Sequence, residues 1–381
     1  MIKPAKDENL MSKKYSGKQV IRAGEKLLDD AIFENRPEFE SAMDILSYWR
    51  FTHEAPLGEA FKAVQETVLQ IDKSAIFAKR LKRYVSIMNK LRRFQDMKLK
   101  NMQDIGGCRA IVSSVKKASQ VIRLLKKRPE FRSPEGKIRF KDYIANPKDD
   151  GYRGYHLIGQ FKARHGAQRS IEVQVRTELQ HEWATALEIV DLFTGQALKS
   201  NQGDPDWKRF FKGVSEQFAI MENIHLFKLG DIDKHQEYLK MVKQSKEAIK
   251  SCADTQKVGR KLAVEKIFQA FTNSLKIVEG ELGKNGVDGY VLIEVDTLKA
   301  TVTVAFFKQD DSKIAGQRYI EAEKKVAGKD GLVVALVSTT AVGGIKEAYP
   351  NYFADSTEFL KHYFLVANAP IPKRFLSSIF G

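Results

Sequence analysis

The fold of the first half of this chain is decided by the stretch Ser170-Ile171-Glu172-Val173-Gln174-Val175-Arg176. Apolar and polar residues alternate strictly, which is the two-residue period of a half-buried β-strand. The apolar side chains at the odd-numbered positions share one face, whereas Glu172, Gln174 and Arg176 share the other. A sheet with one apolar and one polar face places its polar groups in a cleft or in water. The stretch therefore predicts a strand that presents Glu172 to such a space.

Other short strand patterns and helical patterns surround this strand. Residues 109–112 and 155–161 are strand candidates, and a helix is expected from Glu178 to about Leu198. Upstream, Pro56 opens a predicted helix, because its missing N–H costs nothing in the first turn. The apolar stripe of that helix has spacings of 4, 3, 4 and 3 and consists of Leu57, Phe61, Val64, Val68 and Ile71. A second helical pattern covers residues 115–128.

The chain of 381 residues is longer than one hydrophobic core usually supports. Residues 200–206 form the clearest break, a mostly helical stretch follows over 207–273, and a β-rich unit begins near Gly286. Residues 290–296 and 300–307 suggest a hairpin, 332–338 a buried strand, and 348–364 helical or mixed structure. The fold class expected is α+β. Its units are a helix-flanked mixed sheet over 1–200, a helical connector over 201–285 and a small C-terminal α+β domain over 286–381.

Composition limits the class of protein. The formal net charge is +16, which favours phosphate-rich partners, although a generally basic surface that aids solubility is the alternative. Cys108 and Cys252 are the only cysteines, too few for a disulfide framework or a Cys-rich zinc site. The N-terminus lacks the apolar core of a signal peptide, and no apolar run approaches the ~20 residues of a membrane helix. We expect a cytoplasmic, soluble protein without membrane contact.

Two isolated carboxylates stand among many cations. Asp104 precedes one strand candidate, and Glu172 lies on the polar face of another, so neighbouring strand ends could bring them together. Mg²⁺ in phosphate-transferring enzymes takes one or two such carboxylates. Between Lys79 and Lys100 there are nine basic residues against the single acid Asp96. The set suits a magnesium–nucleotide enzyme. The alternative is that Asp104 is a loop residue and Glu172 a solvated strand residue.

Five blocks in this order closely resemble the synthetase domain of the RelA/SpoT alarmone enzymes, and they cover roughly half of the chain. The blocks are residues 80–86, 104–109, 141–144, 147–156 and 172–177. The resemblance implies a nucleotidyltransferase-like sheet that binds ATP and Mg²⁺ and moves the β,γ-pyrophosphate of ATP onto a ribose 3′-hydroxyl, releasing AMP. It implies that Asp104 and Glu172 are catalytic and hold the metal, with Glu172 assisting the metal or activating the hydroxyl.

The same resemblance assigns the two substrates to different residues. The positions that match the ATP site are Arg80, Lys82, Ser86, Lys90 and Arg109. The positions that match the acceptor site are Lys141, Lys148, Tyr152, His156 and Glu188. Tyr152 would stack on the acceptor base. Family members often carry Ser where Gly154 stands, which leaves the details of acceptor binding open.

The acceptor itself has two candidates. The chain contains no His-Asp dipeptide, so it resembles the short forms that lack the hydrolase domain. Some short forms use guanosine or adenosine nucleotides, and others pyrophosphorylate the 3′-CCA end of tRNA. Ten basic residues against two acids lie between Lys116 and Lys141, which favours the tRNA acceptor end, because a long polyanion uses many scattered cations. A third reading, an RNA-binding protein that has lost catalysis, is opposed by the intact Asp104 and Glu172.

The C-terminal unit carries a further motif. Tyr349 and Tyr352 stand three apart in a Tyr-x-x-Tyr element, and together with the zinc-free domain they resemble the CapRel family of fused toxin–antitoxin defence proteins. That resemblance implies a pseudo-zinc-finger-like domain whose tyrosines block the adenine site. It also implies release by a phage protein, typically the major capsid protein. The alternative is that both tyrosines are core aromatics. The oligomeric state expected is a monomer.

Overall fold

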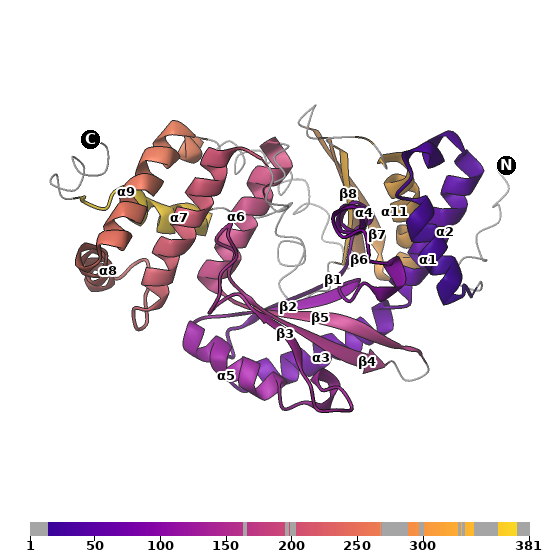
Figure 1. The fold of residues 1–381 in the computed structure, drawn as a ribbon, viewed down its shortest axis with the longest axis horizontal. Coiled ribbons are helices and arrows are strands. Elements are labelled where there is room, and N and C mark those ends of the chain that lie inside the picture. The colour runs from indigo at the N-terminus through magenta and orange to yellow at the C-terminus, as the bar shows by residue number, and fades with distance from the viewer. Residues whose placement is uncertain are drawn as a thin grey trace.

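The computed structural model describes a central sheet with helical groups at its two ends (Figure 1). The described residues are 14–162, 166–194, 198, 203–266, 268, 289–296, 301–326, 329, 332–338 and 357–371. In this part of the chain no helix is long and apolar enough to span a membrane. Cys108 and Cys252 are buried and unbridged.

Five strands form the central sheet in the order β1-β2-β5-β4-β3. Their bounds are β1 Ile76–Leu81, β2 Gly106–Val112, β3 Arg139–Asp142, β4 Tyr155–Lys162 and β5 Gln168–Thr177. β2 and β5 are parallel and set Gly107 opposite Glu172, whereas the other three pairings are antiparallel. The sheet is therefore mixed, and the predicted α+β class is confirmed. The strand predicted at 170–176 lies inside β5, with Ile171, Val173 and Val175 fully buried.

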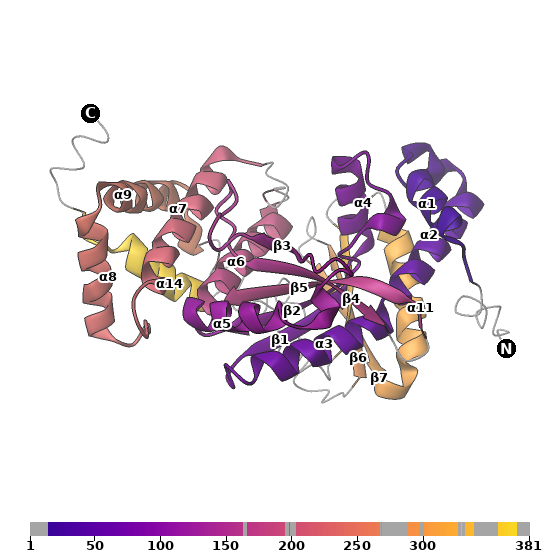
Figure 2. The same ribbon diagram turned by 60° about the horizontal axis from the view of Figure 1, so that its bottom comes forward.

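Two helices cover the apolar face of this sheet, α3 Glu54–Val68 and α5 Val115–Leu125 (Figure 2). Leu57, Val64 and Val68 of the predicted stripe are buried against the sheet, and Phe61 and Ile71 pack at its margin. α3 begins at Glu54, two residues before the predicted start at Pro56. Proline is tolerated there because the first N–H groups of a helix have no intrahelical partner.

The N-terminal end of the molecule has its own apolar core. It is formed by α1 Gly17–Lys26, α2 Arg36–Phe51 and α4 Tyr84–Arg93. Short 3₁₀ helices connect these elements and others at Asp30–Glu34, Leu99–Asn101, Pro129–Phe131 and Gln309–Asp311. α4 follows β1 directly and lies beside the polar face of the sheet, which makes it a candidate wall of a site (Figure 1).

A helical bundle follows the sheet. It contains α6 Glu178–Thr194, α7 Pro205–Glu222, α8 Ile232–Gln244, α9 Lys246–Lys261 and α14 Thr357–Ala367. The five helices share one core, in which Phe210, Phe211 and Phe359 are buried. Helix α14 thus packs with α6, α7 and α9 of the bundle, although it follows the C-terminal strands in the sequence.

Besides α14, the described part of the C-terminal segment contains a three-stranded antiparallel sheet and a helix that packs on it. The sheet has the order β7-β6-β8, with bounds β6 Gly289–Asp296, β7 Thr301–Lys308 and β8 Leu332–Ser338, and α11 Ser312–Val326 packs on it. The predicted boundaries at 200/201 and 285/286, and the pair Tyr349 and Tyr352, lie outside the described residues.

Candidate active site

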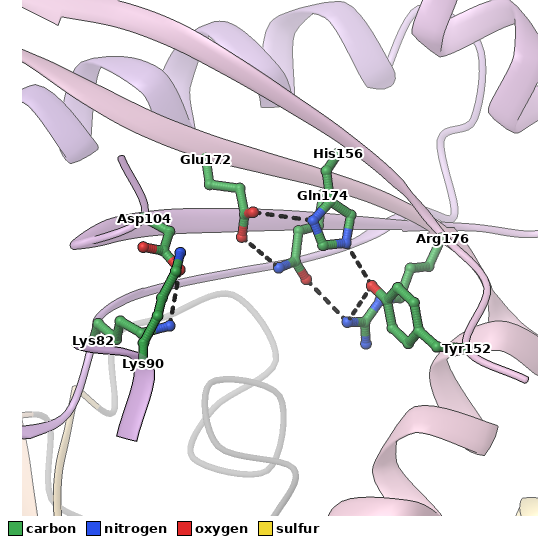
Figure 3. A network of polar contacts seen from close by, with 8 residues as sticks. All are labelled: Lys82, Lys90, Asp104, Tyr152, His156, Glu172, Gln174 and Arg176. Atoms are coloured by element: carbon green, nitrogen blue, oxygen red, sulfur yellow. Dashed lines mark hydrogen bonds and ion pairs between the residues drawn. The ribbon is translucent and has the colours of Figure 1, made fainter. Parts of the chain in front are cut away.

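The polar face of β5 carries a hydrogen-bonded network (Figure 3). The Glu172 carboxylate accepts from Gln174 Nε2 at 2.7 Å and pairs with His156 Nδ1 at 3.0 Å. The Arg176 guanidinium donates to Gln174 Oε1 at 3.0 Å. These side chains project to one side because strand residues two apart share a face, and because the β4–β5 register sets His156 opposite Gln174. Burial opposes ionisation of Glu172, but the bonds from His156 and Gln174 outweigh it and hold its pKa below the usual range.

Tyr152 extends this network toward the helical bundle. Its hydroxyl lies 2.6 Å from His156 Nε2 and accepts from Arg176 Nη2 at 2.9 Å. The Lys148 ammonium lies 4.8 Å from the centre of the Tyr152 ring and 4.7 Å from that of Tyr143. Burial lowers the pKa of Lys148. The loop thus brings two aromatic rings and a cation beside the imidazole.

Asp104 lies at the end of the loop that leads into β2. Its Oδ2 accepts a hydrogen bond from Lys82 Nζ at 2.9 Å and forms an ion pair with Lys90 Nζ at 2.8 Å. Lys82 directly follows β1 and its N–H donates to the Ile105 carbonyl, whereas Lys90 comes from α4. The second carboxylate oxygen, Oδ1, is buried without a hydrogen-bond partner. Figure 3 shows Asp104, in the loop before β2, and Glu172, on the neighbouring strand β5, with both carboxylates directed to the same side of the sheet.

A group of guanidiniums lies along the same face. Burial lowers the pKa of Arg109, and the nearby charges of Arg176 and Arg80 lower it further, whereas Glu188 opposes the shift. Arg109 Nε and the Nε and Nη1 atoms of Arg176 are buried without hydrogen-bond partners. Buried cations with unfilled donors are costly unless an anion compensates them. This part of the site is suited to bind a negatively charged ligand.

His181 of α6 is a neutral neighbour of these cations. Burial lowers its pKa well below the usual range, and the charges of Arg109 and Arg176 act in the same direction. Its Nδ1 is buried without a hydrogen-bond partner. A neutral imidazole can accept a hydrogen bond from a ligand or donate one to it.

Helix α7 holds the loop that carries Tyr152. Ser215 Oγ donates to the Gly151 carbonyl and accepts from Arg153 Nε, the latter at 3.2 Å. Gly151 has φ of +92°, and a Cβ there would lie 3.0 Å from the Cα of Lys212. The close approach of loop and helix therefore requires glycine at this position.

The sequence-predicted site residues form two clusters, a third set beside them and three further positions. Asp104, Lys82 and Lys90 form one cluster, and Glu172, His156 and Tyr152 form the other. Arg80, Arg109 and Glu188 lie within electrostatic reach of one another beside them. Of the remaining predicted residues, Ser86 is half-buried on α4 and Lys148 lies over the ring of Tyr152. Lys141 is exposed on β3, opposite His156 in the β3–β4 register.

Sequence reasoning gave no role to Gln174, Arg176, Tyr143 or His181, which belong to the site. The alternation of β5 placed Gln174 and Arg176 on the polar face and was the available signal for them. Tyr143, in the loop after β3, meets His156 of β4 edge to face at a ring separation of 5.3 Å, a contact that no periodicity in the sequence predicts.

The donor set is compatible with a hard divalent cation. Asp104 retains a buried carboxylate oxygen without a partner, and Glu172 is a second carboxylate on the same side of the sheet. Among the described residues there is no group of three or more His, Cys, Asp or Glu side chains that could enclose a metal. Two carboxylates agree with Mg²⁺, which keeps several non-protein oxygens as ligands. A thiolate or histidine site for zinc does not fit these residues.

Residues 79–189 match the family described as the region found in RelA / SpoT proteins. This RelA/SpoT region contains the sheet residues of both clusters and extends to Glu188. The chain is 33% identical over 115 residues to the GTP pyrophosphokinase YwaC of Bacillus subtilis (strain 168), covering 28% of this chain and 52% of that protein. It is 32% identical over 111 residues to the GTP pyrophosphokinase YjbM of the same organism, covering 28% and 51%. The chain spans about half the length of these curated relatives.

Solved structures similar to this chain include the small alarmone synthetase 1 from Bacillus subtilis bound to its product pppGpp. The identity is 24%, the match covers 46% of this chain and 92% of that one, and the TM-score is 0.38. The small alarmone synthetase 2 from Bacillus subtilis is 23% identical, with coverage of 50% and 95% and a TM-score of 0.36.

Proposed function

We propose that this protein is an ATP-dependent pyrophosphokinase of the RelA/SpoT type. The observation that carries the proposal is the pair Asp104 and Glu172 on one face of the sheet, beside buried guanidinium atoms without partners. Carboxylates for a metal next to unfilled cationic donors are what phosphate transfer needs. The match of residues 79–189 to the RelA/SpoT region supports the same reaction class.

The roles follow from charge and position. Asp104 and Glu172 would hold Mg²⁺, which neutralises charge on the phosphates when it is bound. The cations around them would bind the ATP phosphates, and the guanidinium of Arg80 would stack on adenine. This set consists of Arg80, Lys82, Lys90 and Arg109, with the Ser86 hydroxyl as a further donor. Lys82 and Lys90 now neutralise Asp104, so bound phosphate would draw their ammonium groups away from that carboxylate.

The acceptor would lie on the side of Tyr152 and His156. The 3′-hydroxyl oxygen of the acceptor would bond to the β-phosphorus of ATP and pass its proton to the Glu172 carboxylate, while the bond from that phosphorus to the α,β-bridging oxygen breaks. AMP leaves with the bridging oxygen, and the β- and γ-phosphates stay on the acceptor. Tyr152 would stack on the acceptor base, a contact worth roughly 1–3 kcal/mol. His156, Lys141, Lys148 and Glu188 would orient the ribose and its phosphates.

We propose the 3′-CCA end of tRNA as the acceptor. Of the ten basic residues between Lys116 and Lys141, seven are exposed: Lys116, Arg123, Lys127, Arg132, Lys137, Arg139 and Lys141. Exposed cations spread over α5 and the adjoining edge of the sheet suit a long polyanion. A second candidate is a small alarmone synthetase acting on guanosine or adenosine nucleotides. The curated relatives favour it, since both are named GTP pyrophosphokinases.

One assay tests the reaction and separates the acceptors. The purified chain is incubated with γ-labelled ATP and with deacylated tRNA, GDP, GTP or ATP as acceptor. Label on tRNA supports the first candidate, and label on a nucleotide supports the second. Asp104→Asn and Glu172→Gln should each lower the rate at least ~100-fold, because a charge that binds the metal is lost. Glu66→Gln, an exposed carboxylate of α3, is the matched control and should keep full activity. Transfer that survives in both site variants would contradict the proposed site.

We further propose that the enzyme is a toxin restrained by its C-terminal part and released by a phage protein in an abortive-infection response. A tether gives an effective concentration in the millimolar range, so a weak contact is enough. Holding 99% of molecules closed needs only about 2.7 kcal/mol. The restraint would come from Tyr349 and Tyr352, on the resemblance to the CapRel proteins.

Growth of cells that express the chain tests this restraint. Tyr352→Ala should make expression more toxic, and toxicity should disappear when Glu172→Gln is added. Co-expression of a phage major capsid protein should activate the parent chain but leave the Tyr352→Ala, Glu172→Gln double variant harmless. Unchanged growth with Tyr352→Ala would count against the restraint, whatever the acceptor.

A further inference from the structure

Glu323 is a buried carboxylate far in sequence from the site. It lies on α11, and its side chain and that of Arg50 on α2 are only 5% and 6% exposed. Arg50 Nη1 donates to Glu323 Oε2 at 2.6 Å, and Arg50 Nη2 donates to the Tyr319 hydroxyl at 2.9 Å. The Tyr319 hydroxyl donates in turn to Glu323 Oε1. These three side chains join the C-terminal unit to the N-terminal helices.

Glu323 Oε1 has a second partner outside this group. The backbone N–H of Tyr84, the first residue of α4, donates to it at 3.2 Å. The N-cap residue of α4, Arg83, makes no side-chain capping hydrogen bond. A carboxylate at a helix N-terminus satisfies an orphan N–H and interacts favourably with the helix dipole. Glu323 therefore supplies the cap of α4 from 239 residues away in the chain.

Helix α4 connects this cap to the phosphate side of the site. It carries Ser86 in its first turn and Lys90 in its second, and Lys90 Nζ lies 2.8 Å from Asp104 Oδ2. A helix that frays or turns at its N-terminus moves both side chains, whereas the acceptor side, with Tyr152 on its loop and His156 on β4, is left in place.

We propose that Glu323 is a positioning residue of the synthetase site. By capping α4, Glu323 fixes the positions of Ser86 and Lys90 for binding ATP. The contact of α11 with α2 is therefore coupled to the affinity of the site for ATP. The inference rests on the proposed function for its catalytic readout. Its structural part concerns only α4 and can be measured without catalysis.

The same interface offers a matched control. Lys324, the next residue of α11, pairs with Asp44 of α2 at 2.8 Å. This ion pair joins the same two helices, α11 and α2, through side chains that do not cap α4. If Glu323 were only an interface residue, Lys324→Ala and a change at Glu323 would act alike on the site.

The test variant replaces the buried polar group as a whole: Arg50→Met, Tyr319→Phe and Glu323→Met together. Replacing all partners with apolar side chains avoids a buried unpaired charge, so the interface can remain docked. A melting curve checks that the full-length variant folds. Should it not fold, Arg50→Met with Glu323→Met, which leaves Tyr319 in place, removes the acceptor of the Tyr84 N–H and gives the same comparison.

Amide hydrogen exchange in residues 84–93 and the two Michaelis constants are then measured. Exchange in α4 and the KM for ATP should each rise about fivefold to tenfold, the effect of losing an ordinary helix cap. The KM for the acceptor should change less than about twofold, and Lys324→Ala should leave all three values as in the parent.

Unchanged exchange in α4 of a folded variant overturns the proposal, and so does an equal rise of both Michaelis constants. If the parent chain transfers no pyrophosphate, the proposed function fails separately. Exchange in α4 and the affinity for a non-hydrolysable ATP analogue then decide whether Glu323 positions this helix.

Discussion

His53 is a neutral histidine enclosed between the N-terminal helices and the sheet. It is 2% exposed, and its Nδ1 lies 2.8 Å from the Trp49 carbonyl oxygen. Burial lowers its pKa to about 4, because it outweighs the hydrogen bond to that carbonyl, and the charge of Arg169 adds to the effect. The ring belongs to the support of the sheet and lies outside both clusters of the site.

The lowered pKa predicts acid sensitivity of the fold. As the pH falls below 6.5, the unfolded chain binds a proton at this histidine while the folded chain does not, which favours unfolding. The stability that the neutral ring contributes is therefore complete above pH 6.5 and is lost as the pH falls toward 4. The loss approaches roughly 3 kcal/mol. Urea unfolding of the parent and of His53→Asn, whose amide can replace Nδ1, measures it. The free energies of unfolding of the parent and of His53→Asn, plotted against pH, should converge as the pH falls. A constant difference between them would refute the assignment.

The site residues show what single positions in a sequence can indicate. Asp104 and Glu172 stood out in the sequence as isolated carboxylates among many basic residues. The structure directs both carboxylates to one side of the sheet. His181 had no such signal. His181 lies on α6, and its environment is created by Arg109 of β2 and Arg176 of β5. A role that depends on neighbours from distant segments cannot be predicted from the local sequence pattern.

At the scale of elements, the loop that carries Tyr152 is fixed by α7. The φ of +92° at Gly151 and its approach to Lys212 and Ser215 both exclude a side chain. We expect Gly151→Ala to push this loop away from α7 and to raise the KM for the acceptor, with little change for ATP. The strain and the clash together should cost about 1–3 kcal/mol of stability.

Gly136 provides the control for this prediction. It also has a positive φ, +77°, but a Cβ there would meet nothing within 4 Å. Gly136→Ala therefore carries backbone strain without the clash, and should lower stability slightly and leave both Michaelis constants unchanged. Equal effects of the two variants on acceptor binding would mean that contact with α7 does not hold the loop.

Periodicity predicted some elements of the sheet and missed others for physical reasons. β5 alternates because one face is buried and the other polar, and α3 shows a full apolar stripe. β1, Ile76–Leu81, was missed because Lys79 and Arg80 interrupt its apolar run at the edge of the sheet. β3, Arg139–Asp142, has four residues at the opposite edge, and none of them is buried. Edge strands bury too little to impose a pattern.

At the scale of the whole molecule, the packing of α14 decides which parts of the chain depend on each other. Gln256 of α9 donates to the carbonyl oxygens of Val366 and Ala369, each at 2.8 Å. His362 Nδ1 of α14 lies 2.8 Å from Glu182 Oε2 of α6. Helix α6 also carries His181 of the site. No local pattern could predict this packing, because the partners are more than a hundred residues apart. Helix α14 therefore completes the bundle whose helix α7 holds the loop that carries Tyr152.

Replacing Phe359 tests how much the packing of α14 in the bundle contributes to the free energy of unfolding. Phe359 is 1% exposed and meets the rings of Phe218 and Phe268 at 5.8 and 5.2 Å. Phe359→Ala should lower the free energy of unfolding by about 3–5 kcal/mol, since it leaves a cavity in the bundle core. Phe364→Ala, at a partly exposed position of the same helix, should cost much less. A chain ending before Thr357 should be destabilised more than Phe359→Ala and should lose acceptor binding with the bundle. Thermal melting of the three variants checks this order, and a truncated chain that melts like the parent would show that α14 is dispensable.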